Sequence, residues 1–558
     1  MSATVGGQRL ASGEPTAVRR IARILPALGL AVLLVVDGVL VFNAVRVVQA
    51  AGAAIAYPFE LDFAEGLVLG RTRTLAAGGA LYPPADASLT AVSAYTPVYY
   101  AAAALLGNSL GDHLAAGRGL ALASALLAAL TLAALAWRAI DTAGGLTVRT
   151  FGAACAGLAF LQISYTASWA ALMRVDILAV LFAFIGVLLF AATAARGPHV
   201  YWCVVPFALA VYTKQTTVAA AAACVLTAAR GDLQRGVRLG LCFAVAVLLI
   251  GGAMQLATHG AFAFHVVWAN MHPYHLEQAA SFMQDIAIRY PVLIALAAAT
   301  VPGLLGSAPA AHPASNTRQW TRAVLGAYLP LAVLVSVTVG KVGADVNYFI
   351  EPLGVICVCA ALAAAEALRP GPDAGGWGLA GARAARAQSA VNVRAIESPG
   401  SGASVVAVAV PLLLLWQVLW VTPPAALESI EVPPPAQQAR VATLLDAVRH
   451  VDGPVLSEDL TLLSLAGKPM LLQPFEVTQL VYRHAYDESP LLAALRRGEV
   501  PLVVLRFDVR RPPRLAFDRF TPATITAVRE HYQLRSSFPG YWVYTPDEAG
   551  DRREVAVP

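Results

Sequence analysis

Apolar runs of helical length recur along this 558-residue chain, and they constrain its fold more than any other feature. A run of about 20 apolar residues can cross a bilayer core about 30 Å thick as a helix. Only 13% of the residues are charged, whereas soluble domains have about 25%, so the chain cannot cover a water-soluble surface of this size. The sequence therefore predicts an all-α polytopic membrane protein. Its eleven expected spans lie at about 24–48, 115–137, 148–165, 176–196, 199–213, 216–229, 237–257, 290–308, 322–340, 349–368 and 404–422.

Three of the apolar runs need separate treatment. The pair within 199–229 is short for a bilayer and fits either two tilted helices or a re-entrant pair. The run at 96–106 is shorter still, so we expect it to lie in the outer leaflet without crossing. The first run follows Arg19, Arg20 and Arg23 and is longer than the apolar core of a signal peptide, which indicates an uncleaved first span.

The basic residues set the expected orientation, because Lys and Arg accumulate in cytoplasmic loops. They are Arg138, Arg149, Arg196, Arg230, Arg235, Arg238, Arg318, Arg322, Arg369, Arg383, Arg386 and Arg394. With residues 1–23 in the cytoplasm, eleven spans place all of these loops inside. The transmembrane domain is then 24–422, with its first outer loop at 51–114 and a Gly/Ala/Arg/Ser-rich cytoplasmic linker at 370–402.

The tail at 423–558 differs in composition and is expected outside. Three prolines at 433–435 mark a linker. Strand-like runs at 454–459, 469–475, 500–508 and 540–546 alternate with helical runs, which predicts a small extracytoplasmic α/β domain. The six cysteines all lie in apolar segments without metal-ligand spacing, so we expect small buried side chains and no disulfide framework.

Polar residues cluster where the predicted spans meet the outer side. The stretch FELDFAEG, residues 59–66, follows the first span and holds three carboxylates in eight residues. Five such groups fall on this one side: Glu60, Asp62 and Glu65; Arg174 and Asp176; Lys214 and Gln215; Asn270, His272 and His275; and Lys341, Asp345, Asn347, Tyr348 and Glu351. Singly they have ordinary explanations, Glu60 as a surface charge and Lys341 as a snorkelling side chain. Together they predict one aqueous cavity for a polar substrate on a lipid phosphate, since charges near hydrocarbon are usually paired, solvated or functional.

The acidic stretch also has helical spacing. Asp62 and Glu65 are three residues apart, so a helix through DFAEGLVLGRTRTLAAGG would place both on one face and end at Gly78 and Gly79. Arg71 and Arg73 on this helix are then available to lipid phosphates or to solvent.

The order of the motifs resembles that of the GT-C glycosyltransferases. The resemblance rests on DFAEG at 62–66, GALYPP at 79–84 and YTPVYY at 95–100, with MRVDILA, YTKQTT and VNYFIEP further along. The sequence looks most like bacterial relatives of protein O-mannosyltransferases and aminoarabinose transferases, over most of residues 24–368. The resemblance implies the GT-C fold, with about eleven transmembrane helices and juxtamembrane helices in the first outer loop.

The resemblance also implies a function. Such enzymes move a hexosyl or pentosyl group from a polyprenyl-phosphate donor to a lipid, glycan or protein acceptor on the outer face, by a single inverting displacement. The catalytic acid motif falls on Asp62, with Glu65 in support. Phe63 and Ala64 separate the two acids, which are adjacent in the mannosyltransferase branch, so which one is the base stays open. The implied phosphate ligands are Arg174, Lys214, His272 and Lys341, and the implied substrate ligands are Asp176, Asn270, Asn347, Tyr348 and Glu351.

The sequence also gives expectations for the cofactor, the membrane location and the role of the tail domain. Some GT-C members use a divalent cation, and the acids here could bind one, but no metal-ligand set stands out. We expect a bacterial inner membrane with the tail domain periplasmic or extracellular, and no nucleic acid partner, because no suitable basic tract is present. The tail either helps to bind the acceptor or caps the cavity; on the capping view, which we favour, Glu458, Asp459 and Glu476 are solvated charges.

The alternative functions are a transporter or flippase for a lipid-linked substrate, a glycan polymerase or ligase, or an inactive relative. One-sided polar groups and the lack of a convincing inverted repeat favour the transferase over the transporter.

Overall fold

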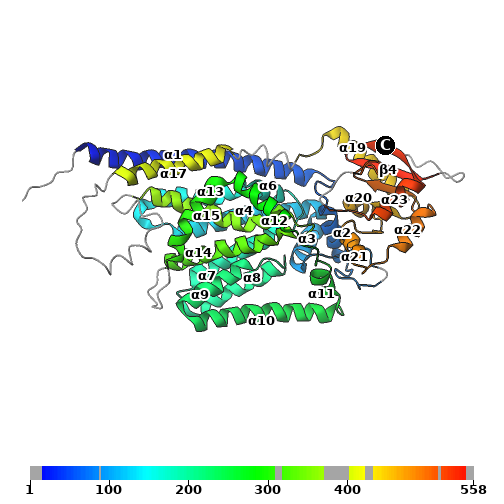
Figure 1. Cartoon of the computed structure of the whole chain (residues 1–558), viewed down its shortest axis with the longest axis horizontal. Helices are drawn as coiled ribbons and strands as arrows, with labels where there is room; N and C mark the ends of the chain where they lie inside the picture. Colours follow the sequence, from blue (N-terminus) through cyan, green and yellow to red (C-terminus); the bar gives the residue numbers. More distant parts are fainter. Residues whose placement is uncertain are drawn as a thin grey trace, which may run out of the picture.

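The computed structural model describes residues 16–86, 89–307, 317–369, 401–420, 431–512 and 517–547. A long helical bundle carries a small α/β domain at one end, and the start of α1 lies at the other (Figure 1). In chain order the bundle contains α1 (Thr16–Ala56), α2 (Glu65–Ala76), α3 (Pro97–Leu110), α4 (His113–Ala139), η1 (Thr142–Gly144), α5 (Gly145–Gln162), α6 (Ser164–Trp169), α7 (Asp176–Thr193), η2 (Gly197–Cys203), α8 (Val204–Val211), α9 (Ala219–Gly231), α10 (Leu233–Ala257), α11 (Ala261–Ala263), η3 (Phe264–Trp268), α12 (Leu276–Arg289), α13 (Pro291–Leu305), α14 (Thr317–Ser336), η4 (Val337–Gly340), η5 (Val346–Phe349), α15 (Ile350–Ala367) and α17 (Ser401–Trp420).

Each of the eleven predicted spans coincides with an apolar helix. Seven helices in the described residues are long and apolar enough to cross a membrane. The other four predictions correspond to the shorter apolar helices Gly197–Val211, Ala219–Gly231 and Val405–Trp420, and to α13, which forms with α12 a pair bent by 95°. The predicted polytopic helical fold is therefore confirmed. The run at 96–106 lies in α3, a helix of 14 residues.

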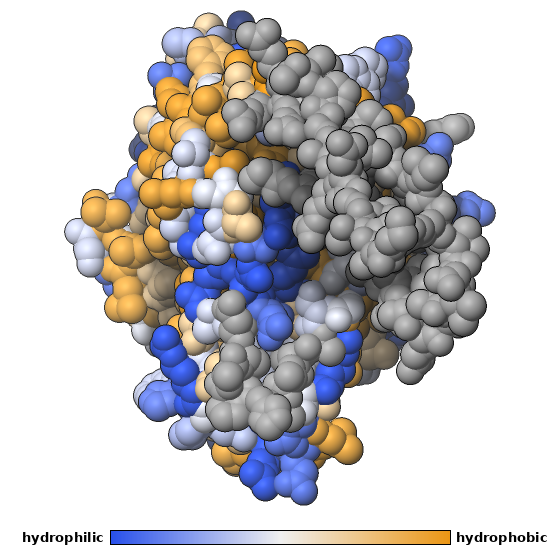
Figure 2. Space-filling model, turned by 90° about the vertical axis from the view of Figure 1, so that its left-hand side faces the viewer, coloured by the Kyte–Doolittle hydropathy of each residue, from blue (hydrophilic) through white to orange (hydrophobic). Residues whose placement is uncertain are grey.

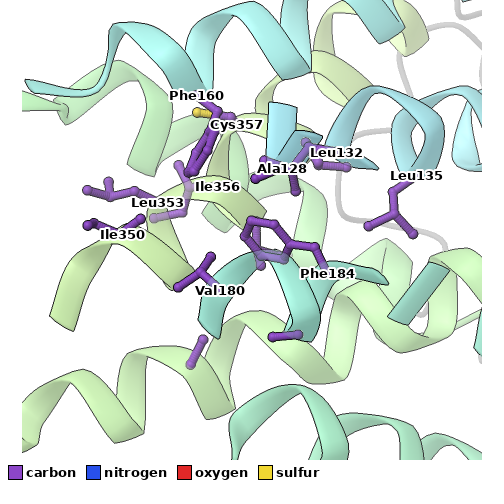
Figure 3. Packing of buried hydrophobic residues seen from close by; sticks show 14 of the residues in the cluster. Ala128, Leu132, Leu135, Phe160, Val180, Phe184, Ile350, Leu353, Ile356 and Cys357 are labelled. Carbon is purple, nitrogen blue, oxygen red and sulfur yellow. The ribbon is translucent and has the colours of Figure 1, made fainter. Parts of the chain in front are cut away.

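The centre of the bundle lies where α4, α5, α7 and α15 meet (Figure 3). The rings of Phe160 on α5 and Phe184 on α7 meet edge to face, with centroids 5.9 Å apart. Gly354 on α15 allows this packing, because a Cβ there would lie 2.6 Å from the Phe184 ring. By contrast, α10 lies at the edge of the bundle (Figure 1). Most of its apolar side chains are exposed. Cys242 on α10 is therefore exposed, while the other five cysteines are buried, and all six are free.

Hydrophilic side chains gather near the middle of the bundle end that faces away from the α/β domain (Figure 2). Helices place basic residues at this end, and several are paired: Arg318 and Arg369 with Asp141, and Arg322 with Glu366. Arg318, Arg322 and Arg369 of the predicted cytoplasmic loops thus lie at one common end, opposite to the polar groups of the first outer loop. Residues 370–400 of the predicted linker lie outside the described residues.

The α/β domain consists of α19 (Pro435–His450), β1 (Val455–Ser457), α20 (Leu460–Ala466), α21 (Glu476–Tyr482), α22 (Ser489–Arg496), β2 (Leu502–Leu505), α23 (Pro522–His531), β3 (Tyr532–Phe538) and β4 (Tyr541–Pro546). The strand order is β1-β2-β4-β3, with β1 parallel to β2 and the other neighbours antiparallel. Three predicted strands are confirmed as β1, β2 and β4. The predicted strand at 469–475 is wrong, since this segment is irregular and leads into α21, and β3 was not predicted.

Candidate functional site

A polar cavity lies between the helical bundle and the α/β domain. It holds about 540 Å³ of empty space, including its opening to solvent. Five separate segments of the bundle contribute to its wall, together with the start of α21 from the α/β domain. The lining residues are Ala94, Tyr95, Arg174, Lys214, Gln215, Thr216, Asn270, His272, Lys341, Val342, Gly343, Ala344, Asp345, Asn347, Tyr348, Phe475 and Glu476.

The polar groups noted in the sequence converge on this cavity. All four predicted phosphate ligands line it, as do Asn270, Asn347 and Tyr348 among the predicted substrate ligands. The remaining four residues, Asp62, Glu65, Asp176 and Glu351, are not among the lining residues, and their contacts separate them into different roles.

Asp62 is linked to the cavity by its ion pair with Arg174, which is a lining residue. Its Oδ1 accepts a hydrogen bond from Nη1 of Arg174 at 2.6 Å, and its side chain is 30% exposed. Burial alone would lower the pKa of Arg174, but the carboxylates of Asp62 and Asp176 outweigh burial and raise it above its usual value. The guanidinium is therefore a permanent cation between the Asp62 carboxylate and the cavity.

Asp176 holds the second cation. At the start of α7, its Oδ1 accepts from Nζ of Lys214 and from the side-chain amide of Asn347, each at 2.6 Å. Its Oδ2 accepts from the Trp169 indole at 3.0 Å. With these donors the buried carboxylate is fully engaged, so it orients Lys214 and Asn347 without facing the cavity.

Lys341 is the least engaged of the cavity cations. Its ammonium donates to the Asn270 carbonyl over 3.4 Å, and no carboxylate of the described chain lies within ion-pair distance of it. Lys214, by comparison, is paired with Asp176 and also lies 4.4 Å from the centre of the Tyr348 ring. A ligand phosphate can therefore bind the Lys341 ammonium with little competition from protein acceptors.

Glu65 has a different environment from Asp62. It is fully buried and forms two hydrogen bonds with Arg118 of α4, at 2.8 and 2.7 Å. It also accepts from the backbone N–H groups of Leu61 and Met173 at 2.9 and 2.7 Å. The expectation that both acids lie on one helical face is wrong, because α2 begins at Glu65 and Asp62 precedes it in a turn.

Arg118 itself was missed by the sequence analysis. The remaining donors of its guanidinium reach the carbonyls of Ala54, Tyr57 and Phe59 at 2.6 to 2.7 Å. It therefore joins the end of α1, the acidic stretch and α4. An arginine inside a predicted apolar span is the signal that points to it, since such a charge needs partners.

Glu351 lies in the first turn of α15. Its Oε1 accepts from the Tyr328 hydroxyl at 2.7 Å. The carboxylate is buried and does not line the cavity.

Three further residues of the cavity had not been given a role in the site. Gln215 lines the cavity and donates to the carbonyls of Ala94 and Val266. Phe475 and Glu476 come from the α/β domain, and Glu476 lies 3.1 Å from Nε2 of His272. Their contribution depends on a contact between distant segments, which no local pattern encodes.

His265 fixes the loop that forms the cavity wall near Ala94. Its Nδ1 accepts from the Ser93 N–H at 3.1 Å, and its Nε2 donates to the Pro83 carbonyl at 2.8 Å. Burial lowers the pKa of His265 to about 4, so the imidazole is neutral near pH 7, as these two hydrogen bonds require.

Several charges expected at the surface are buried instead. Glu60 is 7% exposed, and in the α/β domain Glu458 and Asp459 are buried as well, so the expectation of solvated charges is wrong for these three. Arg71 and Arg73 do not reach out to lipid or solvent either, because they donate to the carbonyls of Ala91 and Ser464. Glu60 and Arg73 contact Arg506 and Ser464 of the α/β domain, whereas Glu458 and Asp459 are bound by Arg506 within the domain itself.

Within the residues that the structure covers, no three His, Cys, Asp or Glu side chains are grouped so that they could hold a metal ion. The acids of the site are instead engaged by Arg174, Arg118 and Lys214.

Comparison with known proteins shows what this arrangement resembles. No family model and no curated protein matches the sequence. Among solved structures, ArnT from Cupriavidus metallidurans in the apo state matches with a TM-score of 0.57 at 14% identity, over 91% of this chain and 97% of that chain. The same protein bound to undecaprenyl phosphate matches with a TM-score of 0.54 at 15% identity, over 92% and 99% of the two chains.

A second solved protein has the same architecture. The archaeal oligosaccharyltransferase AglB from Archaeoglobus fulgidus, in complex with an inhibitory peptide and a dolichol-phosphate, matches with a TM-score of 0.50 at 11% identity. The match covers 92% of this chain and 74% of AglB. At these identities the likeness concerns the fold, and it confirms the GT-C fold that the motifs had led us to expect.

Proposed function

We propose that this chain is a membrane glycosyltransferase that moves a sugar from a polyprenyl-phosphate donor to an acceptor at the membrane face next to the α/β domain. One observation carries the proposal: the Asp62 carboxylate is held by Arg174 beside a cavity lined with cations. The donor class is supported by two solved proteins of similar fold, one bound to undecaprenyl phosphate and one in complex with a dolichol-phosphate.

The cations of the cavity suit the phosphate of the donor. Lys341, Lys214 and Arg174 line one cavity and differ in how strongly the protein already engages them. Fixed cations stabilise the negative charge that grows on a departing phosphate, and they are more effective in a partly buried site than in water. His272 lines the same cavity and completes this set of phosphate ligands.

Asp62 is the proposed general base. Its carboxylate accepts the proton of the acceptor hydroxyl while the acceptor oxygen forms a bond to the anomeric carbon. The bond from that carbon to the phosphate oxygen breaks, and the polyprenyl phosphate leaves with the electron pair. A single displacement of this kind inverts the anomeric centre. Glu65 supports the reaction as a positioning residue, since Arg118 and backbone donors occupy both of its oxygens.

The other predicted site residues fall into two groups. Asn270 and Tyr348 line the cavity and are proposed to contact the sugar. Asp176, Asn347 and Glu351 are proposed to orient the cations and the cavity floor, because Asp176 binds Lys214 and Asn347 directly.

The proposed setting is a bacterial inner membrane, with the α/β domain outside the cytoplasm. The gathering of basic side chains at the opposite end of the bundle supports this orientation through the positive-inside rule.

The test is product release. Purified protein in nanodiscs is incubated with a lipid extract that contains polyprenyl-phosphate sugars and candidate acceptors, and free polyprenyl phosphate is measured by mass spectrometry. The proposal expects release by the wild-type protein and none above background by Asp62→Asn. Movement of intact lipid-linked sugar across proteoliposomes, without release, would support the transporter alternative instead.

A further inference from the structure

The acidic stretch at 59–66 is packed against the α/β domain. Phe59 is buried in the same hydrophobic cluster as Leu444, Leu460 and Tyr541 of that domain. Gly66 allows an even closer approach, because a Cβ at this position would lie 2.4 Å from the backbone nitrogen of Thr461 in α20. Both ends of the stretch are therefore in direct contact with a domain that begins almost 370 residues later in the chain (about residue 431).

Glu60, two residues before Asp62, enters a buried charge cluster of the α/β domain. Its Oε1 lies 3.0 Å from Nη2 of Arg506, which is also 3.0 Å from Oδ2 of Asp459. Thr461 and Tyr541 donate to the two carboxylates at 3.2 and 2.7 Å. Arg506 is the cation between these two acids, and its guanidinium also lies 4.2 Å from the centre of the Tyr541 ring.

The electrostatics of this cluster make Arg506 indispensable to it. Burial and the neighbouring charge of Asp459 raise the pKa of Glu60 well above its usual value, and Arg506 opposes this rise. Two buried carboxylates without a cation would repel one another at short range. Without Arg506, Glu60 would be expected to leave the cluster or to take up a proton.

Phe63, the residue after Asp62, is held by a second arginine of the domain. The guanidinium of Arg519 lies 3.4 Å from the centre of the Phe63 ring and 4.5 Å from that of Phe517. The backbone carbonyl of Arg519 also accepts from the Phe475 N–H at 2.7 Å. Arg519 thus connects the acidic stretch with the cavity wall that Phe475 forms.

We infer that the α/β domain positions the Asp62 carboxylate, with Arg506 acting through Glu60 as a positioning residue of the transfer reaction. Asp62 lies between two residues that the domain fixes, Glu60 and Phe63, while its own carboxylate is bound to Arg174 of the bundle. The domain would then be a working part of the site, and not only its cover. The kinetic part of this inference rests on the proposed transferase function, whereas the structural part does not.

The experiment compares Arg506→Gln with the wild-type protein by two readouts. Backbone amide hydrogen exchange of residues 59–66 is expected to accelerate at least about 10-fold, as the stretch opens locally. The kcat for sugar transfer is expected to fall about 10- to 100-fold with the donor KM changed less than about 3-fold, because a small displacement of a catalytic group lowers the rate while the cavity cations stay in place. Arg506→Lys, which keeps a cation, should recover part of kcat.

The matched control is Arg497→Gln in the same domain. Arg497 forms an exposed ion pair with Glu499, and both side chains are more than half exposed. This variant should leave both readouts at wild-type values. If Arg506→Gln does not fold, Glu60→Gln is measured in its place, because this variant keeps the Arg506–Asp459 ion pair. Its kcat is expected to fall about 3- to 10-fold, where about 1 kcal/mol corresponds to a factor of 5.

Two results would overturn the inference: unchanged exchange at 59–66 in the folded variant, or faster exchange with unchanged kcat. A wild-type protein without transfer activity would remove the proposed function but not the structural part. In that case localised acceleration at 59–66 would still support positioning by the domain, and unchanged exchange would still contradict it.

Discussion

At the scale of single residues, the site separates two carboxylates that look equivalent in the sequence. Asp62 and Glu65 are three positions apart, yet Asp62 is partly exposed and bound to Arg174, while Glu65 is fully buried and bound to Arg118. The ambiguity between the two acids could not be resolved from the sequence, because it depends on which arginine each acid meets. Those arginines come from segments about 50 and 110 residues further along the chain.

The first prediction concerns Asp62→Asn. We expect kcat to fall about 10²- to 10⁴-fold, because an amide cannot accept the acceptor proton. The free energy of unfolding should change by less than about 1 kcal/mol, since the ion pair with Arg174 is partly solvated on the Asp62 side. Steady-state transfer kinetics and thermal unfolding in detergent measure the two effects.

A neighbouring acid provides the control for this substitution. Asp345 lines the same cavity, is exposed and accepts from the Val346 N–H at 2.7 Å. Asp345→Asn should retain that hydrogen bond and near-wild-type kcat. Equal losses in the two variants would mean that overall negative charge in the cavity, and not a base at position 62, matters for transfer.

The second prediction separates the two lysines of the cavity. Lys341→Met should raise the donor dissociation constant about 10-fold and leave stability unchanged, because Lys341 makes one weak contact. Lys214→Met should lower the free energy of unfolding by about 3 kcal/mol, because it leaves the buried Asp176 without its closest cation. Calorimetry measures donor binding and thermal unfolding measures stability for the two variants. Equal losses of unfolding free energy in both would contradict the different roles assigned to the two lysines.

At the scale of helices and loops, hydrophobic periodicity was a sufficient guide to the bundle. Apolar length alone located the apolar helices, seven of which, among the described residues, are long enough to cross a membrane. A helix in lipid must satisfy its backbone internally and expose apolar side chains. The same information did not place α2 correctly relative to Asp62. The start of α2 is fixed by Glu65, whose carboxylate accepts from backbone N–H groups just before the helix, and by its contact with Arg118.

The short strands of the α/β domain were harder to predict. Segment 469–475 has apolar residues typical of a strand, but Phe475 has a positive φ of 68°, and its N–H is bound by the Arg519 carbonyl. A tertiary contact therefore overrides the local preference. Strand β3 escaped prediction because QLRSS at its centre is mostly polar, and it is paired with β4 only.

The third prediction concerns the element junction held by Arg118. Arg118→Leu should lower the free energy of unfolding by about 3–5 kcal/mol, since it leaves the buried Glu65 carboxylate without its cation and removes a donor from each of three carbonyls. Arg289→Leu is the matched control: its pair with Asp285 is 46% and 40% exposed and should contribute less than about 1 kcal/mol. Thermal unfolding of the two variants gives the comparison, and similar small losses would show that the junction is not held by Arg118.

At the scale of the whole molecule, the site exists because two parts of the chain meet. The bundle supplies Arg174, Lys214 and Lys341, while the α/β domain supplies Phe475 and Glu476. The sequence located the bundle's contribution, since charges at the ends of apolar helices are conspicuous. It could not locate the contribution of the domain, whose charged residues look like those of any soluble domain until their partners are known.

The fourth prediction concerns orientation. Thr142 follows Asp141, the partner of Arg318 and Arg369 at the basic bundle end, and Ser489 lies in α22 of the α/β domain; both are exposed. In intact spheroplasts, a membrane-impermeant maleimide should label Ser489→Cys and not Thr142→Cys, because the positive-inside rule places the basic end in the cytoplasm. Lysis should make both accessible. The reverse pattern in intact cells would invert the proposed topology.

The central claim is that the cavity between bundle and domain binds a polyprenyl phosphate beside Asp62. The most direct measurement is a structure of the purified protein determined by electron cryomicroscopy in nanodiscs with an added polyprenyl phosphate. The account predicts phosphate density within about 3 Å of Lys341 and of Lys214 or Arg174, with the Asp62 carboxylate next to the same space. Phosphate bound elsewhere, for example among the basic residues at the opposite end of the bundle, with this cavity empty, would contradict it.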